Sequence, residues 1–216
     1  MPAKDATRAL ERAAARLGFA RVAGVDEVGR GCLAGPVMAG AVVLDPDRPL
    51  TGLRDSKLLS ARARNRLCSL IRDCAAGWAV AAVEPVDIDR LNIHQATLLA
   101  MRRAVLALVP LPDLVLVDAF RIPNLWIPQR AVVGGDRRSA SIAAASIVAK
   151  VLRDSQMEEL DRADPRYGFA AHKGYGTPSH LAALRRHGYG PAHRRSFRPA
   201  SLLDLLDTNP PEGPHD

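Results

Sequence analysis

The chain has 216 residues, of which 48% are hydrophobic, so it is long enough to bury a core and is not a disordered protein. Its formal net charge of +7 favours an anionic partner without naming one. No apolar run is long enough to cross a bilayer, and the N-terminus has no apolar signal core. The three cysteines have neither zinc-ligand nor redox-motif spacing. We therefore expect a cytoplasmic protein that has no membrane partner.

The hydrophobic pattern predicts strands that come first and then alternate with helices. In chain order we expect a helix over 5–17, strands over 20–25 and 37–44, a helix over 60–76, a buried strand over 78–83, a helix over 92–108, strands over 114–117 and 131–133, and helices over 139–161 and 177–187. Ser60 and Thr177 are the expected N-caps of two of these helices. This order predicts an α/β domain, in which a mixed sheet is flanked by helices and the final helices form a small C-terminal part.

Acidic residues directly follow two of the apolar strands. Asp26 and Glu27 come after Val25, and Asp118 comes after the strand over 114–117. Charged groups at the ends of buried strands are costly unless something uses them. Mg²⁺ and Mn²⁺ prefer such oxygen ligands. A single aspartate at a strand end more often caps a neighbouring element, but three acids on two strands together favour a metal site.

Two further acids are candidates for the same site. Asp136 follows two glycines, a bend that can aim a side chain back at the sheet. It also lies three residues before Ser139, where it could instead stabilise the start of a helix. Asp154 lies on the expected long helix, where a surface or ion-pair role is the simpler interpretation. The sequence leaves open which of the two is the fourth carboxylate.

A glycine-rich loop and several polar clusters complete the set of candidates. Glycines in Gly29-Arg30-Gly31 would let the backbone approach a ligand closely, although such a motif taken alone is better explained as a tight turn between strands. Tyr175 lies between two glycines, where it could stack on a base or sugar or pack in the core. The polar clusters, which suit phosphate contacts, are Asp55-Ser56-Lys57, Lys150, His172-Lys173-Gly174-Tyr175-Gly176-Thr177 and His193-Arg194-Arg195.

Taken together, these segments resemble ribonuclease HII, the bacterial type 2 ribonuclease H family. The first and last matching motifs are specific, and the order of all of them over about residues 22–198 is more specific still. Val28, Cys32 and Leu58 depart from the residues that are common in the family. The matching segments are 24–31, 33–37, 55–57, 87–92, 116–118, 142–151, 153–154 and 172–177.

The resemblance implies a fold and a set of roles. The fold is a ribonuclease H-like core (19–165), preceded by an N-terminal helix (1–18) and followed by a helical substrate-binding part (166–206) and a flexible tail (207–216). Two Mn²⁺ or Mg²⁺ ions, about 4 Å apart, would bridge the scissile phosphate. The implied metal ligands and catalytic residues are Asp26, Glu27, Asp118 and Asp136. The implied substrate-binding residues are Gly29, Arg30 and Gly31 at the ribose 2′-hydroxyl, Tyr175 at the sugar, and Ser56, Lys57, Lys150 and Lys173.

The activity that the resemblance implies is endonucleolytic. It is hydrolysis of the RNA strand of RNA–DNA hybrids, and cleavage 5′ of ribonucleotides embedded in duplex DNA, by a monomer that leaves 3′-hydroxyl and 5′-phosphate ends. Rival interpretations are a non-catalytic nucleic-acid binder, another metal-dependent nuclease of the same fold, and a nucleotide-binding enzyme. The three strand-end carboxylates oppose the first, the Gly-Arg-Gly loop and Tyr175 oppose the second, and the lack of a phosphate-loop lysine opposes the third.

Overall fold

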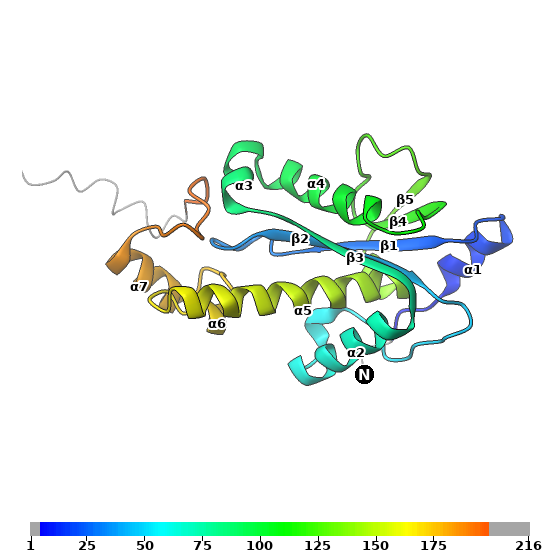
Figure 1. Cartoon of the computed structure of the whole chain (residues 1–216), viewed down its shortest axis with the longest axis horizontal. Coiled ribbons are helices and arrows are strands. Elements are labelled where there is room, and N and C mark those ends of the chain that lie inside the picture. The colour runs from blue at the N-terminus through cyan, green and yellow to red at the C-terminus, as the bar shows by residue number, and fades with distance from the viewer. Residues whose placement is uncertain (1–4, 199–216) are drawn as a thin grey trace, which may run out of the picture.

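The computed structural model, which describes residues 5–198, has a five-stranded mixed sheet with helices on both faces (Figure 1). The strands are β1 (Val22–Val28), β2 (Val37–Leu44), β3 (Ala75–Val83), β4 (Leu114–Asp118) and β5 (Gln129–Val132). Their order is β3-β2-β1-β4-β5. Strand β2 is antiparallel to both β1 and β3, whereas β4 is parallel to both β1 and β5. The predicted mixed sheet and α/β class are confirmed.

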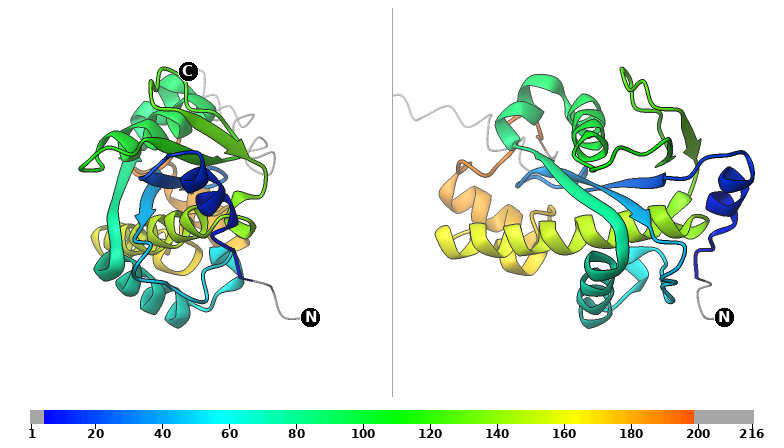
Figure 2. Two further views of the ribbon diagram at one scale, coloured as in Figure 1. Left: turned by 90° about the vertical axis from the view of Figure 1, so that its right-hand side faces the viewer. Right: turned by 45° about the vertical axis from the view of Figure 1, so that its right-hand side comes forward.

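The helices form a layer on each face of this sheet. They are α1 (Ala9–Arg16), α2 (Ala61–Cys74), α3 (Pro85–Leu91), α4 (Ile93–Leu106), α5 (Ala140–Ala163), α6 (Phe169–His172) and α7 (Pro178–His187), with the 3-10 turns η1 (Ser56–Leu58) and η2 (Gly135–Arg137). Helices α3 and α4 cover one face, α5 and α2 cover the other, and α6 and α7 lie at one end of α5 (Figures 1 and 2). The predicted caps are confirmed, because Ser60 and Thr177 accept hydrogen bonds from the backbone of the following turn.

Several predicted boundaries were wrong. Strand β1 continues past Val25 to Val28, because its last residues pair with the first residues of β2. Asp26 and Glu27 therefore lie within the strand. The helix expected over 92–108 is preceded by a separate α3, because Asn92 takes a φ of 68° between the two and caps α4. Strand β3 is an edge strand and mostly half-buried, and α1 begins only at Ala9.

The predicted division of the chain stays a prediction. Helices α6 and α7 do follow the predicted core boundary at residue 165, as the expected C-terminal helical part requires. The predicted tail over 207–216 lies outside the described residues, as does the end of that C-terminal part. Within residues 5–198, no helix is both long and apolar enough to cross a membrane.

Helix α5 packs unusually close to the sheet because two strand positions carry no side chain. A Cβ atom added at Gly24 of β1 would lie 2.1 Å from the carbonyl carbon of Ser141. A Cβ atom at Gly40 of β2 would lie 2.5 Å from the carbonyl oxygen of Ala145. Neither glycine has a positive φ, so close approach, and not backbone conformation, requires it. The helix backbone thus rests directly on β1 and β2.

Because of this close contact, a single methyl group added at Gly24 should strongly destabilise the fold. We expect Gly24→Ala to lower the free energy of unfolding by about 3 kcal/mol, since backbone atoms would have to move to make room. Urea unfolding followed by circular dichroism measures the change. Gly77→Ala on β3 is the matched control, because its Cβ would meet nothing closer than 3.5 Å, and it should change stability by less than about 0.5 kcal/mol. Equal stability of the two variants would contradict the close packing of α5.

Candidate active site

Parallel pairing of β1 and β4 brings two carboxylates together. The last paired residues of these strands are Val25 and Val117, and an aspartate follows each of them. Side chains of paired residues in parallel strands point to the same face, so Asp26 and Asp118 share the face that α5 covers. Glu27 begins on the opposite face but lines the same cleft as these two aspartates. The expected convergence of acids from neighbouring strands is found.

The carboxylates line a cleft of about 440 Å³. All of the predicted site residues except Lys173 contribute to its walls. The lining residues are Asp26, Glu27, Val28, Gly29, Arg30, Gly31, Ser56, Lys57, Arg64, Asp118, Asp136, Ser146, Lys150 and Tyr175. Segments far apart in the chain therefore meet here, and acidic side chains face basic ones across one hollow.

Burial and mutual repulsion disfavour the charged state of the central carboxylates. Only 7% of Asp26 is exposed, and burial raises its pKa well above the usual range, with the negative charges of Glu27 and Asp118 adding to the effect. Burial also raises the pKa of Glu27, although the Arg30 guanidinium, 3.8 Å away, opposes that shift. At these two carboxylates, burial and like charges thus outweigh the effect of the neighbouring cations.

Asp136 belongs to the same electrostatic group. It lies on η2, just before α5, and burial followed by the charges of Asp55 and Asp118 raises its pKa. The backbone N–H of Gly135 donates a hydrogen bond to Oδ1 of Asp118 over 2.7 Å, which ties this turn to β4. Among the two candidates for a fourth carboxylate, Asp136 is the one that lines the cleft.

The donor set fits a hard divalent cation in chemical character. Four carboxylates supply only oxygen ligands, and Oε2 of Glu27 is buried without a hydrogen-bond partner. Within the described residues, no three acidic, histidine or cysteine side chains are already gathered closely enough to form a complete metal site. Binding of an ion would therefore require the carboxylates to close in around it, with solvent or substrate oxygens completing its coordination.

Asp154 and Lys173 are engaged outside the cleft. Asp154 on α5 forms an ion pair with Lys150 one turn earlier, with 2.6 Å between Oδ1 and Nζ. This is the ion-pair role that the sequence favoured. Nζ of Lys173 lies 2.6 Å from a carboxylate oxygen of Glu158, and Lys173 does not line the cleft. The structure therefore gives no geometric support for a phosphate contact by Lys173.

Two residues of the cleft were not singled out from the sequence. Ser146 on α5 shares a hydrogen bond of 3.0 Å with Ser56, and its hydroxyl lowers the pKa of Asp26. Arg64 on α2 donates to the carbonyl oxygens of Ser56 and Leu59 over 2.7 and 2.6 Å, which fixes η1 against the cleft. Ser146 stands in a small-residue run of α5, and Arg64 is one of several arginines on α2, so neither carried a distinguishing local signal.

The segment that carries Tyr175 is docked on the connection between β1 and β2. Gly174 has a φ of 85°, and a Cβ atom there would lie 2.4 Å from the carbonyl oxygen of Ala34. The carbonyl of Gly174 accepts a hydrogen bond of 2.8 Å from the N–H of Leu33. The side chain of Tyr175 is 41% exposed and lines the cleft, so it is not a core residue.

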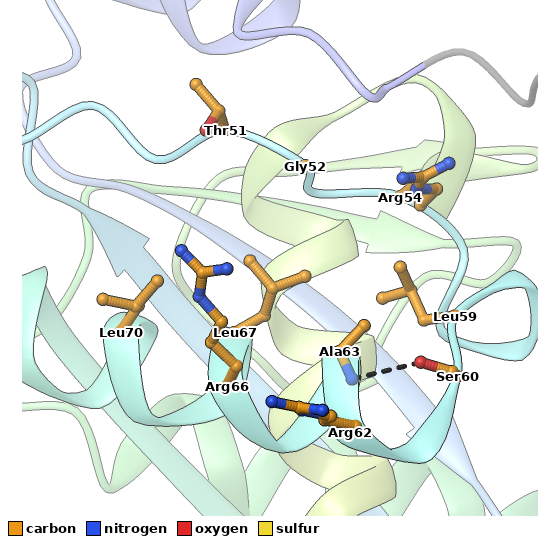
Figure 3. A pocket seen from close by; sticks show the side chains of 10 residues that line it. All are labelled: Thr51, Gly52, Arg54, Leu59, Ser60, Arg62, Ala63, Arg66, Leu67 and Leu70. Carbon is orange, nitrogen blue, oxygen red and sulfur yellow. Dashed lines mark hydrogen bonds between the residues drawn. The ribbon is translucent and has the colours of Figure 1, made fainter.

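A second hollow, of about 480 Å³, lies between the 51–54 segment and α2 (Figure 3). Its walls are leucines, arginines and small residues, and the cap of Ser60 on α2 is visible in the figure. This hollow is similar in size to the cleft at Asp26 but is lined by no carboxylate, histidine or cysteine. It therefore lacks ligands for a metal ion, and the carboxylate cleft is the candidate active site.

Three histidines pack together in the C-terminal part beside Tyr175. His172 and His180 stack with ring centroids 4.3 Å apart, and the Nε2 atoms of His180 and His193 are 3.1 Å apart. Burial, followed by the charge of His180, lowers the pKa of His193 to about 4, and burial lowers that of His180. The rings of His180 and His193 are therefore neutral in the folded protein near pH 7.

This cluster predicts a loss of stability in acid. Because the folded pKa of His193 lies below its unfolded value, the unfolded chain binds more protons between about pH 6.5 and pH 4. We expect the free energy of unfolding to fall by roughly 2 kcal/mol from pH 7 to pH 4.5, and His193→Gln to reduce this fall. Urea unfolding at several pH values measures it. The exposed His187 is the control, and a His193→Gln profile identical to that of His187→Gln would contradict the assignment.

Comparison with known proteins gives the family of the chain and agrees with its fold. The family model for ribonuclease HII matches residues 23–200. The ribonuclease HII of Azoarcus sp. (strain BH72) is 57% identical over 190 residues, which cover 88% of this chain and 92% of that protein. The ribonuclease HII of Nitrosococcus oceani is 57% identical over 179 residues, which cover 83% and 89%.

Solved structures show the same architecture. The crystal structure of ribonuclease H2 from Pyrococcus horikoshii OT3 has a TM-score of 0.72 and 26% identity, and the match covers 86% of this chain and 97% of that one. The structure of Bst-RNase HIII in complex with Mn²⁺ has a TM-score of 0.68 at 21% identity, over 90% of this chain and 71% of that one, and supports the fold alone.

A ribonuclease H-like sheet with this cleft defines the chain as a nuclease of the hydrolase class. More narrowly, the chain belongs to the ribonuclease HII family, as the family model and relatives that share more than half of its residues show. Membership implies endoribonuclease activity on RNA–DNA hybrids and use of divalent metal ions.

Proposed function

We propose that this protein cuts on the 5′ side of ribonucleotides, both in RNA–DNA hybrids and singly embedded in duplex DNA. The observation that carries the proposal is the meeting of Asp26, Glu27, Asp118 and Asp136 with the Gly29-Arg30-Gly31 loop in one cleft. The carboxylates supply a site for hydrolysis of a phosphodiester, and the bare backbone supplies a surface that a ribose can approach closely. Cleavage would leave 3′-hydroxyl and 5′-phosphate ends.

The carboxylates are proposed to hold two Mn²⁺ or Mg²⁺ ions. Such ions, when bound, activate water and neutralise charge that develops on a phosphate. Their ligands would be Asp26, Glu27, Asp118 and Asp136. A bound cation would relieve the mutual repulsion of these carboxylates. The same cleft is also lined by the cations Lys57 and Lys150, which we propose contact the phosphates on either side of the scissile bond.

Tyr175 and Ser56 are proposed to place the substrate within the cleft. The ring of Tyr175 would stack on the sugar next to the scissile phosphate, for which its exposure and its flanking glycines suit it. Ser56 is 4% exposed and held by Ser146, so it would offer its groups from a fixed position. The proposal includes action as a monomer in the cytoplasm, a compartment where free cysteines such as Cys32, Cys68 and Cys74 persist.

A DNA duplex that carries one ribonucleotide tests the proposal directly. We expect cleavage only at the ribonucleotide, on its 5′ side, with Mg²⁺ or Mn²⁺ present. Asp26→Asn should lower kcat at least about 100-fold, because the substitution removes a charged ligand without changing the shape of the side chain. Gel analysis of end-labelled strands gives both the position and the rate of cleavage.

The controls separate the rival interpretations. An all-DNA duplex of the same sequence should stay intact, and its cleavage would indicate a general metal-dependent nuclease. Binding of the ribonucleotide duplex without cleavage would indicate a non-catalytic binder. Circular dichroism of Asp26→Asn should match the parent protein, so that lost activity reflects the site and not the fold.

Asp136→Asn and Asp154→Asn form a matched pair that identifies the fourth carboxylate. We expect Asp136→Asn to raise the Mg²⁺ concentration needed for half-maximal activity about tenfold or more, because a charged ligand near Asp118 is lost. Asp154→Asn breaks only the ion pair with Lys150 and should leave this concentration within about twofold. A metal titration of the cleavage rate measures both, and the reverse result would assign the ligand to Asp154.

A further inference from the structure

Two arginines are completely buried beneath the Gly29-Arg30-Gly31 loop. Arg153 on α5 and Arg194 near the end of the described chain are both 0% exposed. Neither forms an ion pair within the described residues. A buried charge without a carboxylate partner destabilises the folded protein, which indicates that these arginines have another role.

Their partners are backbone carbonyls, all but one of them in the connection between β1 and β2. Arg194 donates from NH2 to Gly29, from NH1 to Arg30 and from Nε to Gly35, over 2.7, 2.9 and 3.0 Å. Arg153 donates to the carbonyls of Ala34, Pro36 and Lys173 over 3.0 to 3.2 Å. Only Arg194 therefore binds the carbonyls of the Gly-Arg-Gly loop itself.

These bonds determine where the amides of the loop point. In a planar trans peptide, the C=O of one residue and the N–H of the next point in opposite directions. Because Arg194 draws the carbonyls of Gly29 and Arg30 inward, the N–H groups of Arg30 and Gly31 point away from it, on the side of the cleft that these residues line. In the described part of the chain, neither N–H donates a hydrogen bond.

The position of Arg194 is itself fixed from several directions. The two residues that follow Arg194 are held by α3. The backbone N–H groups of Arg195 and Ser196 donate hydrogen bonds of 2.9 Å each to the carboxylate of Asp89. The Arg194 guanidinium lies 5.1 Å from the centroid of the Phe197 ring. Burial lowers the pKa of Arg194 to about 10, so the side chain is still charged near pH 7. It is thus a fixed, charged donor under a loop that has few side chains.

We infer that Arg194 is a positioning residue for ribose recognition: by holding the carbonyls of Gly29 and Arg30, it presents the N–H groups of Arg30 and Gly31 to a 2′-hydroxyl oxygen. Arg194 does not contact substrate and acts only through these two peptide groups. The inference rests on the proposed function, since it needs a ribose in the cleft. The sequence placed Arg194 in the cluster His193-Arg194-Arg195, which suits phosphate contact. That expectation is wrong for Arg194, because it is buried, whereas Arg195 is exposed.

The test compares Arg194→Lys with Arg153→Lys in an Asp118→Asn background that allows binding to be measured. Both substitutions keep the buried charge and lose the planar fork that binds three carbonyls. Fluorescence anisotropy gives Kd for a DNA duplex with one ribonucleotide and for the all-DNA duplex of the same sequence. The preference is the ratio of Kd for the all-DNA duplex to Kd for the ribonucleotide duplex, and we expect Arg194→Lys to lower this ratio on the order of tenfold. Arg153→Lys should leave it within about twofold, although thermal unfolding shows both variants to be destabilised.

Other outcomes overturn the inference. If both variants lower the ratio equally, or neither does, Arg194 has only a structural role. If the Asp118→Asn protein itself shows no preference for the ribonucleotide duplex, the proposed function fails and the inference fails with it. Should Arg194→Lys not fold, NMR of the otherwise unaltered Asp118→Asn protein decides. The amide signals of Arg30 and Gly31 should shift with the ribonucleotide duplex and not with the DNA duplex, and equal shifts would overturn the inference.

Discussion

The site depends on the contact that α5 makes with the sheet at Gly24 and Gly40. Because these positions have no side chains, the helix backbone lies directly on β1 and β2. Directly after Ala145, the same helix contributes Ser146, and one turn later Lys150, to the cleft that holds Asp26. A helix held off by ordinary side chains would leave room for water around that carboxylate. The close contact thus explains both the position of Ser146 and Lys150 in the cleft and the burial that raises the pKa of Asp26.

That burial has an energetic consequence for the protein as a whole. Carboxylates that repel one another in a desolvated cleft destabilise the folded chain, and an unpartnered oxygen such as Oε2 of Glu27 adds to the cost. The sheet and its helices must offset this cost through their packed cores. In return, the site already holds the charge that a cation needs, so binding of an ion relieves a strain that the fold imposes. The carboxylates that would bind the cation are therefore the same groups that locally destabilise the folded chain.

The sequence predicted the elements and the meeting of the carboxylates because both depend on local pattern. Apolar runs that lead into Asp26 and Asp118 indicate two strands, each of which carries an acid after its apolar run. Parallel pairing of the two strands then brings these acids together. The sequence did not predict that β1 reaches Val28, because that extension comes from pairing with β2. Nor did it predict the break at Asn92, where the chain turns with a positive φ but without glycine or proline.

The roles of the basic residues were harder to predict, since burial of a cation is a non-local property. His193-Arg194-Arg195 looks like one basic cluster along the chain, yet Arg194 is buried and Arg195 is exposed. The difference arises from carbonyls more than 150 residues earlier, in the loop from Gly29 to Gly35. A loop with few side chains lets a sugar come close, but its own carbonyls then need partners on the inner side. The five donors of an arginine meet that need in one plane. The Gly29-Arg30-Gly31 loop, which we propose contacts a hydroxyl through its amides, has such a buried donor behind it in Arg194, and the C-terminal part of the chain supplies that donor.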